Sequence, residues 1–133
     1  MARKQSIEDE AIVIKRDKVY TSYFSRASKI VPDRRLVSIA RTSPEGWNCG
    51  FIRELNPSQS LLYNYKQGKV TDKEYEETYQ LETLNALDPQ EIYNQVKGKV
   101  LCCWEKSDCF CHRHLILKWL QKNLGENIIG GEI

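Results

Sequence analysis

Short runs of apolar and β-branched residues alternate along the chain with segments of helical periodicity. The apolar runs predict strands at residues 18–22, 36–40 and 100–104. The run at 36–40 is almost entirely apolar or small, as expected for a strand that is covered on both faces. Strands interspersed with helices predict a small three-layer α/β domain around a short, mostly parallel sheet.

Capping residues mark the predicted helices. Ser58 is a suitable N-cap, and Thr71 has Glu74 three residues later, which is the spacing of a capping box. Asp88 combines an N-cap with a following proline that fits the first helical turn. Glycines at 68, 98 and 125 are predicted to end helices. Caps included, the predicted helices cover residues 23–30, 58–66, 71–87, 88–98 and 111–124.

Residues 1–17 differ from the rest of the chain. They are charged and weakly patterned, with one apolar run at residues 11–14, and we interpret them as an N-terminal arm or an edge strand. Residues 18–133 then form a single domain, a length that allows one sizeable core. The N-terminal segment lacks the apolar core of a signal peptide, and the apolar runs are far shorter than the roughly 20 residues of a membrane span.

The charge and the cysteine content indicate which partners and which cellular compartment to expect. The net charge is +2, from 20 basic and 18 acidic residues that are interspersed, so nucleic acid is not indicated as a partner. The five cysteines are an odd number, and the adjacent Cys102 and Cys103 point to opposite faces of a predicted strand, which is poor geometry for a disulfide between them. We therefore expect a cytoplasmic protein in a reducing compartment, with no membrane partner. The sequence does not indicate the oligomeric state.

The cysteines and histidines, which can act as nucleophiles, acid/base groups or metal ligands, are concentrated between Lys99 and His114. This stretch holds four of the five cysteines and both histidines. In open α/β folds, ligands bind beyond the carboxyl ends of strands, where the free N–H groups of the next helix converge. The sequence therefore predicts the functional site at the carboxyl edge of the sheet.

This stretch also carries a family resemblance. The segment Cys103-Trp-Glu-Lys-Ser-Asp-Cys-Phe-Cys-His-Arg-His-Leu115, followed by Lys118-Trp-Leu120, resembles the carboxyl-terminal signature of domain-of-unknown-function family 488. That signature has Cys-x-Glu-Lys at a strand end, Cys-His-Arg opening a helix, and a Trp-Leu pair. In this chain it falls on Cys103, Glu105, Lys106, Cys111, His112, Arg113 and Trp119-Leu120. The likeness covers about residues 18–125 and implies a Rossmann-like fold, but little about activity, because the family is largely uncharacterised.

The chain departs from the family pattern at two places. Many members have Asp two residues before the arginine that follows the second strand, where this chain has Ile39-Ala-Arg41. Cys102 and Cys109 are additional to the signature.

Side chains that can donate hydrogen bonds to an anion lie at the predicted strand ends and at the start of the last helix. Arginine offers a fork of N–H donors to phosphate or carboxylate, and aromatic residues near the site could stack a nucleobase. Alternatively, the arginines pair with Glu45, Glu105 or Asp108 and only hold loops in place. We predict a site for a small anionic, nucleotide- or nucleoside-like ligand, formed by Thr21, Ser22, Tyr23, Arg41, Cys103 and Arg113.

Three residues are predicted to be catalytic if the ligand is turned over. Glu105 and His112 form the expected acid/base pair. Cys111, at a helix N-terminus beside His112 and Arg113, is in an environment that lowers a thiol pKa and favours the nucleophilic thiolate. The sequence does not identify a cofactor and leaves open whether a reaction is catalysed.

Two alternatives stay open. One is a non-enzymatic module whose cleft sequesters a ligand or a partner protein. The other is a zinc-stabilised structural protein, since Cys103, Cys109, Cys111 and the two histidines supply enough ligands for a tetrahedral site. The Cys109-x-Cys111 spacing is tighter than the usual zinc pair, and His112 and His114 point in different directions on a helix. No residue is therefore assigned to a metal.

Overall fold

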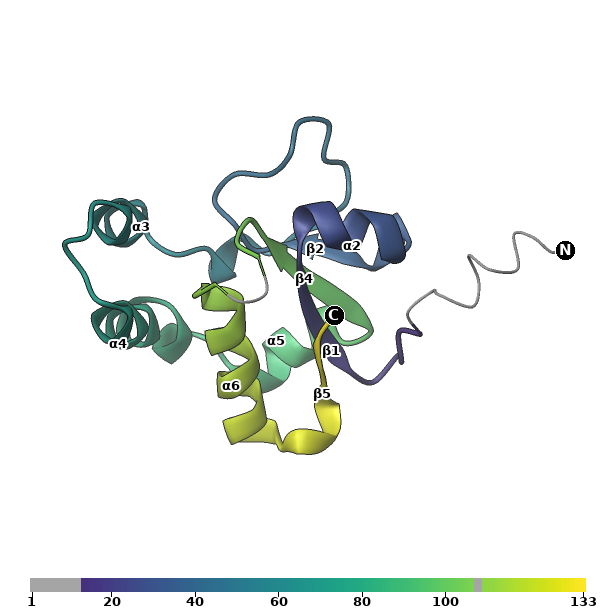
Figure 1. Ribbon diagram of the computed structural model, residues 1–133. Coiled ribbons are helices and arrows are strands. Elements are labelled where there is room, and N and C mark those ends of the chain that lie inside the picture. The colour runs from purple at the N-terminus through teal and green to yellow at the C-terminus, as the bar shows by residue number, and fades with distance from the viewer. Residues whose placement is uncertain (1–12, 107–108) are drawn as a thin grey trace, which may run out of the picture.

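The sheet at the centre of the protein is entirely parallel. The computed structural model describes residues 13–106 and 109–133. Within these, five strands form one sheet in the order β3-β2-β4-β1-β5 (Figure 1). Their bounds are β1 Val19–Tyr23, β2 Leu36–Ser38, β3 Gly50–Phe51, β4 Lys99–Cys103 and β5 Ile129–Glu132. The predicted fold class, a small Rossmann-like α/β domain, is confirmed.

Helices cover both faces of this sheet (Figure 1). The α-helices are α2 Phe24–Ile30, α3 Gln59–Lys66, α4 Asp72–Glu82, α5 Pro89–Val96 and α6 His112–Leu124. Helix α2 and the loop after β2 cover one face, around Phe24 and Ala27. Helices α5 and α6 cover the other face, with α4 packed outside α6 and α3 beside α4. Short 3₁₀ helices span Asp33–Arg35, Arg53–Leu55, Leu84–Ala86 and Glu126–Ile128.

The predicted caps are present in the structure. The Ser58 hydroxyl accepts a hydrogen bond from the Leu61 N–H at 3.1 Å. Thr71 and Glu74 form the full capping box, with each side chain bonded to the other's backbone N–H. Asp88 caps α5 through the N–H of Gln90. These side-chain oxygens satisfy N–H groups that have no partner within the helix, which is why the helix starts could be located from sequence.

Several predicted boundaries are wrong. The helix expected to reach Leu87 ends at Glu82 and is followed by a separate 3₁₀ turn. The strand expected through Trp104 ends at Cys103, and the strand expected through Ala40 ends at Ser38. The edge strands β3 and β5 were not predicted. The apolar run at 11–14 lies partly outside the described residues, and no strand forms at residues 13–18.

Strand β5 was not predicted because its amino-acid composition is unlike that of a strand. It contains Gly130 and Gly131, residues that are disfavoured in strands. A side chain at Gly130 would collide with the ring of Tyr20, so the glycine is required for β5 to lie against β1.

Among the described residues, none of the helices has both the length and the apolar character needed to cross a membrane.

Candidate functional site

A cavity of about 340 Å³ opens at the carboxyl ends of β2 and β4. The loops that follow these strands line one side, through residues that include Arg41, Trp104 and Glu105. Helices α3 and α4 line the other side, and the start of α6 closes it with His112. The cavity therefore lies at the sheet edge that the sequence predicted.

Aromatic side chains dominate the wall on the α3–α4 side. The rings of Tyr65, Tyr75 and Phe110 contact one another, with centroids 5.2 to 5.4 Å apart. The Tyr65 hydroxyl donates a 2.6 Å hydrogen bond to Asp72, and this bond, together with burial, raises the pKa of Tyr65 to about 12. The wall is therefore uncharged at neutral pH and offers flat apolar surfaces, joined on the other side by Trp104.

Two cations stand at the rim of the cavity. Arg41 and Lys66 are both exposed. Arg41 donates one hydrogen bond, from Nη1 to the Pro57 carbonyl at 3.3 Å, which leaves its other N–H groups directed elsewhere. Among the described residues that line the cavity, Glu105 is the only carboxylate, and it is half-buried. The rim thus combines two positive charges with one negative charge.

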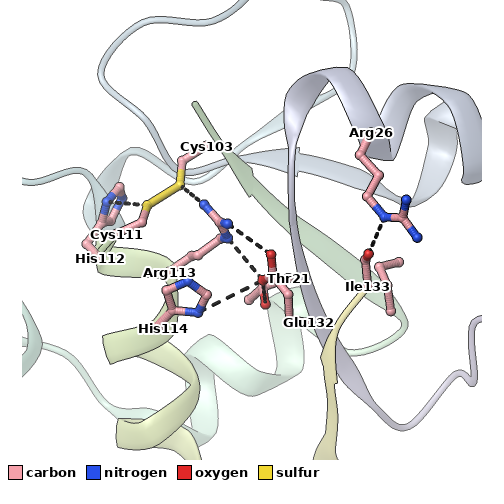
Figure 2. A network of polar contacts seen from close by, with 9 residues as sticks. All are labelled: Thr21, Arg26, Cys103, Cys111, His112, Arg113, His114, Glu132 and Ile133. Atoms are coloured by element: carbon pink, nitrogen blue, oxygen red, sulfur yellow. Dashed lines mark hydrogen bonds and ion pairs between the residues drawn. A yellow bond between two sulfur atoms is a disulfide. The ribbon is translucent and has the colours of Figure 1, made fainter. Parts of the chain in front are cut away.

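A disulfide joins Cys103 and Cys111 (Figure 2). Both residues line the cavity, and we call this part its floor. Cys103 ends β4 and Cys111 is the N-cap of α6, and both side chains are buried. The sequence analysis weighed only the adjacent pair Cys102–Cys103, and the bonded partner lies eight residues along the chain. Cys111, predicted as a thiolate nucleophile, therefore carries no thiol in this state.

His112 is fixed in one tautomer by its surroundings. Its Nε2 lies 2.7 Å from the carbonyl oxygen of Ile39, and because a carbonyl only accepts, Nε2 carries the hydrogen. The lone pair of Nδ1 then faces the Cys111 sulfur at 3.7 Å (Figure 2). Burial lowers the pKa of His112 to about 4, and the hydrogen bond to Ile39 offsets only part of that effect. The ring is neutral at neutral pH.

Arg113 forms an ion pair with Glu132 (Figure 2) and does not line the cavity. Its side chain is fully buried, and its Nε and Nη2 groups donate to the two Glu132 carboxylate oxygens at 3.1 and 2.9 Å. Nη1 donates to the Cys103 sulfur at 2.8 Å. Thr21 adds a 2.5 Å hydrogen bond to Glu132. Arg113 therefore ties α6 to β4, β1 and β5.

The chain matches the model of DUF488-N3a, described as the active DUF488-N3 subclade, over residues 14–124. The chain belongs to this family. No curated protein and no solved structure matches the chain.

The structure divides the predicted site residues of this family member into two groups. Five of them line the cavity together: Arg41, Cys103, Glu105, Cys111 and His112. The predicted binders Thr21, Ser22 and Arg113 are buried and do not line it, and Tyr23 lies half-buried at the end of β1. Thr21 and Ser22 are enclosed because β1 lies inside the sheet, between β4 and β5, whereas Arg113 on α6 is directed to Glu132.

Some residues of the site were not predicted. Glu132 was missed because β5 was missed. Tyr65 and Tyr75 were missed because helical spacing does not distinguish a residue that faces the core from one that faces a cavity. Lys66, adjacent to Tyr65, gave no signal beyond its charge.

The buried neutral state of His112 predicts a pH dependence of stability. Its folded pKa of about 4 lies below the ordinary value of 6.5, so between these values the unfolded chain binds a proton that the folded chain does not. The free energy of unfolding should fall as the pH drops from 6.5 to 4, by about 3 kcal/mol in all, with no further loss from this group below pH 4. Above pH 6.5 this contribution is fully present.

Denaturant unfolding of the disulfide form at several pH values measures this effect. The His112→Gln variant is the control, because it lacks this proton site while keeping His114. The difference in stability between wild type and variant should shrink toward pH 4. A difference that is constant from pH 7 to pH 4, or an NMR titration of His112 near pH 6.5, contradicts the assignment.

Proposed function

We propose that the cavity binds a small anionic ligand that carries an aromatic ring, of the nucleotide or nucleoside-like class. The observation that supports this most is the pairing of an aromatic wall with a cationic rim in one cavity. Its volume of about 340 Å³ is at the lower end of the range for small-molecule sites, about 300–1,000 Å³. A single nucleotide is therefore a better fit than a dinucleotide.

The ring of the ligand belongs at the aromatic side. Tyr65, Tyr75 and Phe110 already pack on one another, so a planar base that enters the cavity meets a preformed surface. Trp104 is anchored by hydrogen bonds from its ring N–H to Thr42, which keeps the indole near the opposite edge. Stacking on such rings tolerates any base, so base identity depends on other contacts.

The anionic group belongs at the rim. Arg41 and Lys66 are the cations there, and Arg113 is excluded because Glu132 and Cys103 take its donors. Arg41 is the better phosphate or carboxylate ligand of the two, because its planar fork binds two oxygens at once. The sequence analysis named both arginines, and the geometry favours Arg41.

If the ligand is turned over, Glu105 is the acid/base group that remains. Both ring nitrogens of His112 face other groups, and Cys111 is bonded to Cys103. Glu105 is half-buried on the cavity wall, within reach of a ligand held by Arg41. The description of the family model as an active subclade supports turnover over simple sequestration.

The binding proposal is tested by calorimetric titration with the common nucleoside 5′-monophosphates, the matched nucleosides and inorganic phosphate. We expect at least one monophosphate to bind and its nucleoside to bind at least tenfold more weakly. The Arg41→Met variant should lose about 10- to 100-fold in affinity, the usual cost of a charged hydrogen-bond partner. Arg34→Met, which removes an exposed arginine outside the cavity, should bind like wild type. Absence of binding by every monophosphate, or equal effects of the two variants, contradicts the proposal.

Turnover is tested separately with the Glu105→Gln variant. Incubation of the bound nucleotide with the wild-type protein, followed by mass spectrometry of the small molecules, should show a product. Removal of the general base should slow product formation by about 10²- to 10⁴-fold and leave the affinity nearly unchanged. If the wild-type protein binds without forming product, the protein is a sequestering module and the enzymatic proposal is wrong.

A further inference from the structure

The floor of the cavity gathers three atoms of the kind that bind soft divalent metal ions. These are the sulfurs of Cys103 and Cys111 and one ring nitrogen of His112, all within 4.8 Å of one another. We propose that the reduced form of this group binds one zinc-class divalent ion, with its fourth coordination position open to the cavity. This proposal does not depend on the nucleotide assignment, because it concerns only the floor residues.

The sulfur–nitrogen distance matches a shared metal ion. Zinc–sulfur and zinc–nitrogen bonds of about 2.3 and 2.0 Å at a tetrahedral angle place the two ligand atoms about 3.5 Å apart. The Cys111 sulfur and His112 Nδ1 are 3.7 Å apart. Nδ1 also presents a lone pair rather than a hydrogen, because Nε2 donates to the Ile39 carbonyl. A zinc ion between the two atoms needs no change of tautomer.

The backbone separation of the cysteines also suits metal ligation. Their Cα atoms are 7.7 Å apart, whereas disulfides usually span about 4.4 to 6.8 Å. Two thiolates on one tetrahedral zinc are about 3.8 Å apart, so this wider backbone spacing fits them.

Conversion to the metal form is a balanced two-electron step followed by an exchange. A dithiol reductant supplies two electrons and two protons, so the sulfur–sulfur bond breaks into two thiols while the dithiol closes into its own disulfide. The metal ion then displaces the two thiol protons and forms two bonds to sulfur and one to nitrogen. The metal keeps its oxidation state throughout.

The surroundings provide the supporting contacts that such sites have (Figure 2). The Nε2–H of His112 is held by a backbone carbonyl, which is the usual orienting contact of a ligating histidine. Arg113 donates to the Cys103 sulfur, and Glu132 balances the charge of Arg113. Two thiolates neutralise a divalent ion, so the buried assembly has no net uncompensated charge.

The three ligands leave one tetrahedral position, and all three line the cavity. Two cysteines and one histidine with an open position are a ligand set of catalytic rather than structural zinc. The neighbouring His114 is excluded because its ring faces Glu132 at 3.9 Å. The fourth position is therefore available to water or to a donor atom of whatever occupies the cavity.

Cobalt(II) is the probe for this site, because its spectrum reports both thiolate ligation and tetrahedral geometry. The full-length chain is reduced with dithiothreitol, freed of reductant under nitrogen, and titrated with cobalt(II) and then zinc. We expect a thiolate-to-cobalt band in the near ultraviolet, strong visible bands that saturate at one ion per chain, and loss of both when zinc is added. The disulfide form should give neither band.

Variants locate the ligands. Cys111→Ser should weaken cobalt binding at least tenfold and reduce the thiolate band, while Cys49→Ser, on the opposite face of the sheet, should leave both unchanged. Circular dichroism checks that each variant folds, and the wild-type spectrum decides the question if Cys111→Ser does not fold. An octahedral spectrum without a thiolate band, equal binding by the oxidised chain, or unchanged binding by a folded Cys111→Ser variant overturns the proposal.

Discussion

The buried ion pair between Arg113 and Glu132 holds the start of α6 against the sheet. A fully buried guanidinium is tolerated only when its charge and its hydrogen-bond donors are satisfied, and the Glu132 carboxylate on β5 balances the charge and accepts two of the hydrogen bonds. The same carboxylate accepts from Thr21 on β1, and the same arginine donates to Cys103 on β4. One interaction thereby fixes the first turn of α6 against three neighbouring strands.

The position of α6 in turn determines what faces the cavity. With Arg113 directed toward the sheet, the preceding residues Cys111 and His112 line the cavity floor. His112 receives its tautomer from the Ile39 carbonyl, just beyond β2. The rim cations and the aromatic wall come from loops and helices outside this network, so the floor of the cavity and its other walls are supplied by separate parts of the structure.

Local sequence signals predicted the parts of the fold that local interactions stabilise. The caps at Ser58, Thr71 and Asp88 each satisfy backbone N–H groups within four residues, and all three were located correctly. Strand β5 is stabilised by distant partners, since its glycine accommodates Tyr20 and its carboxylate pairs with Arg113. The residues next to β5 in the sequence do not indicate these distant contacts. The site followed the same rule: the carboxyl edge was predictable from topology, whereas the role of Arg113 depended on a strand that the pattern does not reveal.

A double-mutant cycle between Arg113 and Glu132 tests the central claim most directly, with the free energy of unfolding measured in denaturant for Arg113→Met, Glu132→Leu and the double variant. The account predicts that Glu132→Leu alone costs about 3 kcal/mol or more, because it leaves a buried arginine uncompensated, and that adding Arg113→Met restores much of the loss. Costs that simply add, or a loss below about 1 kcal/mol for Glu132→Leu, the size expected of an exposed pair, would contradict it.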